Sequence, residues 1–326
     1  MKAARVLSFD PLPDVLPTVD WGLRAPQLNA DPAMVRLTRG YWFHKPKHYE
    51  PAMLSVLLHR HFRRNMSGLP ITGLHALRLY KVPVDSTQHW INPTLGHEPA
   101  PRARAFVSAM GSPHLAWNRY RPTSELGGAT MTKSYGLNPY LGPSECALTH
   151  PIEALTVAAP YLSAWRIIAC LDYLLAHRIQ VTNKIWLKPF DREEISRTLA
   201  LLPPRSRSAC RIARLLSHAV ERTWSSPETL TRLLVLKNGF PPPSMNPLVM
   251  LDGRERFPDL AWVAKRTALE YNSNDHAIDT QIYRDENYRL ERFRDAGWKV
   301  RVLTWDDLRH PDRRAQWMCW LDQQLR

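Results

Sequence analysis

The segment 256–308 constrains the fold most, because strand-forming and helix-forming runs follow one another there in a definite order. Two β-prone runs, 256–262 and 267–272, are separated by a four-residue connection, a length typical of hairpins. A polar helix is predicted from about 280 to 296, Gly297 is suited to end it, and 298–304 form a further strand. This part of the chain is therefore predicted to combine a hairpin with a helix and a third strand.

Two carboxylates meet on the predicted hairpin. If Trp262 pairs with Thr267, Asp259 lies directly opposite Glu270, with Cβ atoms roughly 4.5–5.5 Å apart. Asn272 follows two residues later and belongs to the same face as Glu270. Such a cluster of oxygen ligands suits Mg²⁺ (or Mn²⁺), which polarises a phosphoryl oxygen and lowers the pKa of a bound water.

A carboxylate pair on neighbouring strands has a second interpretation, in which Arg256 or Arg266 neutralises it without any metal. His276, in the loop after the hairpin, is either a general base or an exposed loop histidine. On the following helix, Gln281, Asp285 and Arg289 recur every four residues and share one side.

The balance of charges favours a polyanionic partner. The chain of 326 residues has 44 Lys and Arg against 30 Asp and Glu, which gives a net charge of +14. Arginine makes bidentate contacts with phosphate, so DNA is the expected partner. Helical spacing predicts one basic stripe formed by Arg207, Arg211, Arg214 and His218, either on phosphates, with the three arginines as the contacts, or on a solvated face.

Cysteine spacing and hydropathy exclude several other classes. The four cysteines contain no CxxC pair, which argues against a zinc knuckle and against a disulfide framework. We find no secretory apolar segment and no run long enough to span a membrane. The chain is therefore expected to be cytoplasmic, without a membrane partner.

The part before the prolines at 203–204 is predicted to form a separate region. Residues 1–32 are expected to be an extended lead-in, and 31–41 a short helix that runs through a turn at Arg39-Gly40 into a strand. Helices are predicted at 51–64 and 71–79, so that 33–80 could form a winged-helix-like unit. Its phosphate contacts would be Arg60, Arg63 and Arg64, and 81–203 are expected to be an α+β domain.

The C-terminal residues 205–326 resemble a known family along their whole length. The motifs that carry the resemblance are Ser226-Pro227-Glu228-Thr229 with Arg232, Asn238-Gly239-Phe240-Pro241, Phe257-Pro258-Asp259-Leu260-Ala261-Trp262, Ala268-Leu269-Glu270-Tyr271, His276, Gln281, Asp285, Arg289, Ala296-Gly297-Trp298 and the closing run 302–308. They are similar to the very-short-patch-repair-type endonuclease domain of the PD-(D/E)XK superfamily.

This resemblance implies a restriction-endonuclease-like α/β core, a central mixed sheet flanked by helices. It assigns Asp259 and Glu270 as metal ligands and Glu228 as an accessory acid, and it places Gln281, Asp285 and Arg289 around the site. The family usually reads Glu-x-Asp-Gly after the hairpin, whereas this chain has Asn272 and Ser273 in place of Asp and Gly. An amide in place of a carboxylate removes one negative charge and weakens the attraction for Mg²⁺.

The N-terminal part resembles the abortive-infection antitoxins and transcriptional regulators that precede this nuclease-like domain in actinobacterial chains. The resemblance depends on the motifs 37–41 and 71–77 and on the helical run after 150–155. It implies a winged helix that binds DNA and a toxin partner.

Two functions follow from these observations. The first is a Mg²⁺-dependent DNA endonuclease that hydrolyses phosphodiester bonds. The second is a DNA-binding regulator or antitoxin whose nuclease-like domain is catalytically weakened. The intact Asp259 and Glu270 favour the first, and Asn272 favours the second. The sequence leaves the oligomeric state open.

Overall fold

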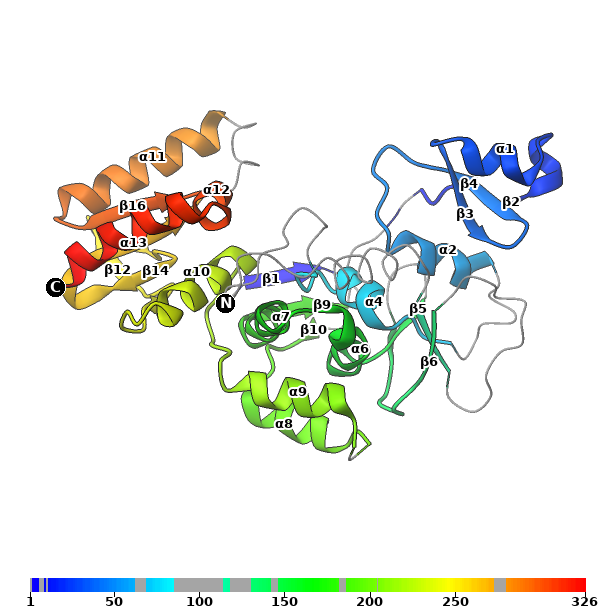
Figure 1. Cartoon of the computed structure of the whole chain (residues 1–326), viewed down its shortest axis with the longest axis horizontal. Coiled ribbons are helices and arrows are strands. Elements are labelled where there is room, and N and C mark those ends of the chain that lie inside the picture. Colours follow the sequence, from blue (N-terminus) through cyan, green and yellow to red (C-terminus); the bar gives the residue numbers. More distant parts are fainter. Residues whose placement is uncertain are drawn as a thin grey trace. The chain divides into compact units, whose positions relative to one another are not determined.

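The structure is a computed structural model that describes residues 2–5, 9, 11–61, 69–84, 114–117, 130–141, 146–181, 186–203, 205–272 and 280–326. These residues form two compact units. The second unit contains Ala164–Ala176 and His218–Arg326, and the first contains the described parts of Met1–Gln88, Pro99–Ser163 and His177–Ser217. The fold belongs to the mixed α/β class, as predicted (Figure 1).

The first unit combines small sheets with short helices. Its elements are β1 (Lys2–Arg5), β2 (Leu16–Pro17), η1 (Thr18–Trp21), α1 (Ala25–Ala30), β3 (Met34–Thr38), β4 (Tyr41–His44), α2 (Met53–His61), α4 (Gly73–Leu79), β5 (His114–Trp117), β6 (Thr130–Lys133), β7 (Tyr140–Leu141), β8 (Ala147–Leu148), α6 (Pro151–Ala158), η4 (Ala159–Tyr161), β9 (His177–Gln180), β10 (Trp186–Leu187), α8 (Arg192–Ala200) and α9 (Arg207–Leu216).

Two predictions for the beginning of the chain are wrong. The segment expected to be an extended lead-in contains α1, and its strand β2 joins the three-stranded sheet β2-β4-β3. The segment expected to be a short helix is strand β3, which pairs antiparallel with β4. Gly40 turns the chain between these strands at a φ of 82°, and pairing with β4 outweighs the local helical preference.

The helices predicted after this sheet are confirmed. Helix α2 lies within the predicted range 51–64, of which 51–61 are described, and α4 lies within 71–79. Their apolar residues are buried, Leu54, Leu58 and Leu77 among them. Whether this unit binds DNA as a winged helix stays a prediction.

Helix α7 (Ala164–Ala176) belongs to the second unit although both neighbouring segments belong to the first. The predicted break at Pro160 is present, because η4 separates α6 from α7. The prolines at 203–204 were expected to divide the domains, whereas the compact units divide after Ser163, Ala176 and Ser217. Helix α9 therefore belongs to the first unit.

The second unit is built on a four-stranded mixed sheet. Its other elements are α10 (Ser226–Lys237), β11 (Ser244–Met245), β12 (Val249–Leu251), β13 (Arg254–Arg256), β14 (Leu260–Trp262), η5 (Val263–Lys265), β15 (Thr267–Tyr271), α11 (Thr280–Asp295), β16 (Lys299–Leu303), α12 (Trp305–Arg309) and α13 (Pro311–Leu325). The strand order is β11-β14-β15-β16, in which β14 and β15 are antiparallel and β15 and β16 parallel.

Residues 256–262 were predicted to form one continuous strand, but the structure divides them between two strands. Strand β13, which ends at Arg256, pairs antiparallel with β12 in a separate two-stranded sheet, and β14 begins only at Leu260. Pro258 lies between the two strands and has no N–H to donate to a sheet. This interruption leaves Asp259 immediately before β14.

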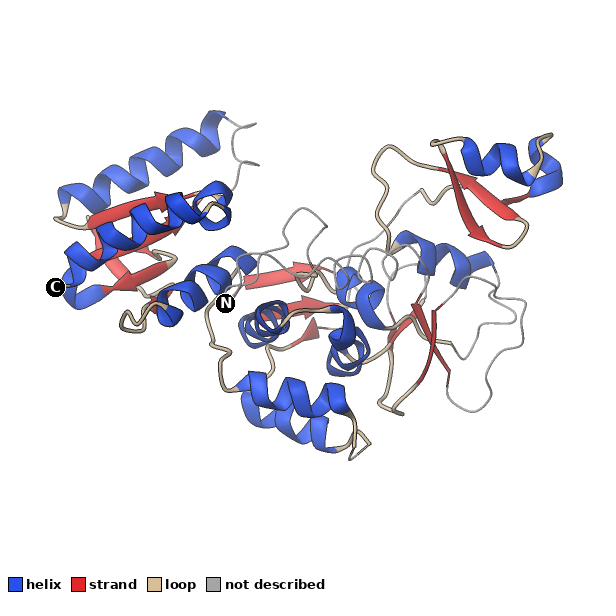
Figure 2. Ribbon diagram, in the orientation of Figure 1, coloured by secondary structure: helices blue, strands red, loops and turns tan. Residues whose placement is uncertain are grey.

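Helices cover both faces of the sheet (Figure 2). One face packs through Leu260, Leu269 and Leu303 against apolar residues that include Trp165 of α7 and Trp317 of α13. On the other face, Ala261 and Ala268 pack with Phe293 of α11. Small alanines allow α11 to approach the sheet closely, which brings its side chains within reach of the hairpin.

Among the described residues, no helix combines the length and the apolar character needed to cross a bilayer.

Candidate functional site

The strand register brings Asp259 and Glu270 together. Trp262 pairs with Thr267 and Leu260 with Leu269, which confirms the predicted register. Extended by one residue beyond the start of β14, this register places Asp259 opposite Glu270. Side chains alternate along strands, so both carboxylates belong to the face that carries the two alanines beneath α11. Oδ2 of Asp259 also accepts a hydrogen bond from the backbone N–H of Tyr271, at 2.7 Å.

Glu270 is almost fully buried and forms an ion pair with α11. Only 2% of its side chain is exposed, and Nη2 of Arg289 donates to its Oε2 at 2.9 Å. The Arg289 side chain is 26% exposed, so its guanidinium lies between the buried carboxylate and solvent. The sequence pointed to Arg256 or Arg266 as the neutralising residue. Arg256 lies on β13, and Arg266 follows η5 and donates to the carbonyl of Ala296.

Asn272 directly follows β15. Its backbone N–H donates to the carbonyl of Leu303 at 2.8 Å, which extends the pairing with β16 by one residue. Alternation places it on the same face as Glu270. A neutral amide thus follows Glu270 on this face.

Glu228 lies in the first turn of α10 and is 4% exposed. Its Oε1 accepts a hydrogen bond from Oγ of Ser225, and its Oε2 accepts one from the backbone N–H of Trp224. Burial, followed by the negative charge of Asp259, raises the pKa of Glu228 to about 8. Glu228 therefore carries a proton at neutral pH, and its interaction with Asp259 assigns both residues to one site.

Asn246 completes this group of residues, and sequence reasoning did not identify it. Its backbone N–H donates to the carbonyl of Asp259 at 2.9 Å, while its Nδ2 donates to Oε2 of Glu228 at 2.7 Å. No local pattern in the sequence indicated that an asparagine shortly after the prolines at 241–243 would contact two acids.

The remaining predicted site residues are only partly described. His276 lies outside the described residues. Gln281 and Asp285 lie on α11, about two turns and one turn before Arg289 respectively, and their side chains lie outside the described part of the structure.

The donor atoms on the hairpin fit Mg²⁺ in type, because Asp259, Glu270 and Asn272 all offer oxygen. The net negative charge of the site is small, because Arg289 neutralises Glu270 and Glu228 is protonated. In the part of the chain that the structure describes, no three His, Cys, Asp or Glu side chains gather as a metal site. A cation here would therefore have two protein carboxylates and would need further oxygen ligands from elsewhere.

The basic residues predicted to contact phosphate differ in their surroundings. Arg207 and Arg214 are exposed on α9. Arg211, by contrast, donates to the backbone carbonyls of Ala159 and Leu162, at 2.7 and 2.9 Å. Arg211 therefore fastens α9 to the turn after α6, and the predicted stripe has two guanidinium groups open to a ligand.

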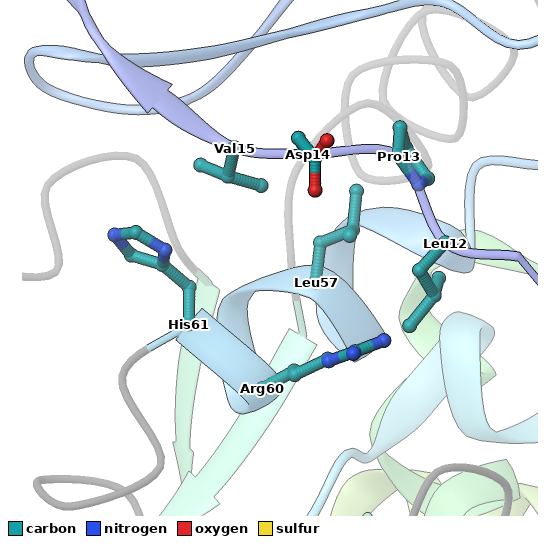
Figure 3. Close-up of a pocket in the computed structure, with 7 residues that line it drawn as sticks. All are labelled: Leu12, Pro13, Asp14, Val15, Leu57, Arg60 and His61. Carbon is teal, nitrogen blue, oxygen red and sulfur yellow. The ribbon is translucent and has the colours of Figure 1, made fainter.

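Arg60 is exposed on α2 and borders an open cavity of about 340 Å³ in the first unit. Figure 3 shows that the side chains of Leu57, Arg60 and His61 approach the segment 12–15 there. Arg63 and Arg64 lie outside the described residues.

Comparison with protein-family models, with curated proteins and with solved structures found no match.

Proposed function

We propose that this chain is a Mg²⁺-dependent DNA endonuclease that hydrolyses phosphodiester bonds, with Mn²⁺ as an alternative cation. The observation that carries the proposal is the register of β14 and β15, which, extended by one residue, places Asp259 opposite Glu270 on one face of the hairpin. Protonated Glu228 and the guanidinium of Arg289 border the same acids. We further propose that the second unit is a restriction-endonuclease-like domain.

Each residue has a distinct role in this proposal. Asp259 and Glu270 would hold the cation, which when bound polarises the scissile phosphate. Arg289 would move its partly exposed guanidinium toward the phosphate and stabilise the negative charge that develops there. Glu228 would hold a proton beside the reacting group, and His276 remains a candidate general base.

The proposed partner is DNA, bound by the basic surface of a chain whose net charge is +14. Candidate phosphate contacts in the first unit are Arg60, Arg207 and Arg214, which are exposed. A cytoplasmic location, which was expected from the hydropathy of the sequence, and a toxin partner, which is implied by the resemblance of the N-terminal part, are further parts of the proposal.

The proposal is tested by plasmid cleavage with Mg²⁺ or Mn²⁺. Asp259→Asn and Glu270→Gln keep the shape of each side chain but remove its charge, so both variants should lose cleavage. Glu255→Gln is the matched control, because Glu255 is an exposed acid on β13 in the same unit. Cleavage by the wild type that persists in both site variants would overturn the assignment.

A second candidate is a DNA-binding regulator or antitoxin without turnover. The ion pair between Arg289 and Glu270 favours it, because a guanidinium at 2.9 Å competes with a metal for the same carboxylate. This reading predicts salt-sensitive DNA binding without cleavage by the wild type. Cleavage that appears only in Asn272→Asp would indicate a nuclease weakened by the missing carboxylate.

A further inference from the structure

Asn246 is buried in the second unit and forms hydrogen bonds with three other residues, Arg222, Glu228 and Asp259. It is 0% exposed and lies between β11 and β12. Its Nδ2 donates to the carbonyl of Arg222 as well as to Glu228, each at 2.7 Å, and its N–H donates to the carbonyl of Asp259. The Arg222 guanidinium donates back to the carbonyl of Asn246.

The orientation of the Asn246 amide is determined by its surroundings. Both partners of Nδ2 are acceptors, namely the carbonyl of Arg222 and Oε2 of Glu228, which also accepts the N–H of Trp224, so a rotated amide would place its oxygen against two oxygens. Its Oδ1 is buried without a hydrogen-bond donor among the described residues. The Asn246 amide is therefore held by the two hydrogen bonds that it donates, and one of these hydrogen bonds goes to Glu228 of the candidate site.

The backbone conformation at position 246 restricts which residue types can replace asparagine there. Asn246 has a φ of 42°, in the left-handed region that glycine and asparagine adopt most easily. Glycine would satisfy the backbone but has no amide to donate. Asparagine satisfies both requirements, and its two contacts to the site come from different groups: the side chain holds Glu228, whereas the backbone holds Asp259.

We propose that Asn246 is a positioning residue of the candidate site, which holds the carboxyl group of Glu228 beside Asp259. This inference deepens the proposed function and rests on it for its catalytic meaning. The contact geometry itself is testable without any cleavage, because two backbone amides report on the two acids. The N–H of Trp224 donates to Glu228, and the N–H of Tyr271 donates to Asp259.

The variant Asn246→Gly keeps the left-handed backbone and the N–H bond to Asp259 but removes both bonds that Nδ2 donates, to Glu228 and to the carbonyl of Arg222. The matched control is Asp252→Gly, because Asp252 has a φ of 50° and is exposed in the turn between β12 and β13. Amide chemical shifts and hydrogen-exchange rates of Trp224 and Tyr271 are measured by NMR in the full chain. Thermal unfolding is measured on the same samples.

We expect Asn246→Gly to move the Trp224 amide signal and to speed its exchange by about tenfold, which corresponds to the loss of one hydrogen bond's worth of protection. Tyr271 should stay near its wild-type signal, and Asp252→Gly should change neither amide. A Trp224 amide identical to wild type overturns the proposal. Broad changes across the sheet with a lowered Tm also overturn it, because they indicate a general structural role.

Kinetics separate this inference from the proposed function. If the wild type cleaves DNA, Asn246→Gly should lower kcat by about 10²-fold with little change in KM, because a misplaced group costs rate more than binding. Unchanged kcat would overturn the positioning role. If the wild type does not cleave, the endonuclease proposal fails, while a local change at Trp224 still supports the placement of Glu228 by Asn246.

Discussion

Arg289 reaches from helix α11 to strand β15 and donates to Glu270 at 2.9 Å, where the carboxylate is 2% exposed. The pair joins the helix and the sheet on the face that carries Asp259. A carboxylate that is almost completely shielded from solvent requires a positively charged partner. In the structure this partner is Arg289, whereas the proposed activity requires a metal cation at the same carboxylate.

Replacement of this arginine should make the site dependent on metal for its stability. Arg289→Met leaves the buried carboxylate without its ion pair, which should lower the free energy of unfolding by about 1–3 kcal/mol. Mg²⁺ or Mn²⁺ should then stabilise the variant more than the wild type. Urea denaturation with and without cation measures this, and Arg292→Met, which removes a more exposed pair on the same helix, is the control. An equal response to cation in all three proteins would contradict metal binding at Glu270.

The raised pKa of Glu228 should make stability fall as pH rises. The folded protein holds this proton up to a pKa of about 8, whereas the unfolded chain releases it near the ordinary pKa of 4.5. The stabilisation is complete below about pH 4.5 and is lost as pH rises through about 8. Glu228→Gln mimics the protonated acid, so the wild type should lose stability relative to this variant between these values. Parallel pH profiles of the two proteins in urea denaturation would refute the shift.

His150 should produce the opposite dependence in the first unit. Burial lowers its pKa from 6.5 to about 4, and its Nδ1 accepts the N–H of Ile152 at the start of α6. The unfolded chain takes up a proton below about pH 6.5 while the folded protein does not, so stability is lost as pH falls toward 4. His150→Asn keeps a capping side chain without titration. Thermal unfolding from pH 7 to 4 should show a steeper loss in the wild type, and equal slopes would count against it.

A buried ion pair should anchor α7 in the second unit. Asp172 of α7 is 1% exposed and accepts from Arg232 of α10 at 2.9 Å, with a further bond from Oγ1 of Thr229. Asp172→Ala would leave Arg232 buried and uncompensated, at a cost of about 3–5 kcal/mol. Asp312→Ala, an exposed acid on α13, should change stability by less than about 0.5 kcal/mol. Equal urea midpoints for the two variants would show that the pair contributes nothing.

Local sequence pattern predicted the hairpin well. The turn length and the alternation of residues set the pairing of Trp262 with Thr267, and with it the placement of Asp259 opposite Glu270. Helix α11 lies where a polar helix ended by Gly297 was predicted. These features depend on neighbours a few residues apart, which is the range over which a sequence pattern carries information.

Other features depend on residues far apart in the chain. The segment 34–38 became a strand because β4 pairs with it, and α7 joined the second unit because Asp172 meets a buried arginine sixty positions later. Arg211 was expected on a phosphate or on a solvated face but binds two backbone carbonyls, and Asn246 was overlooked. The chemical groups of the candidate site could thus be read from the residues, whereas their partners, burial and charge states were decided by long-range packing. Local propensities carry no information about which distant side chain will replace water around a buried charge.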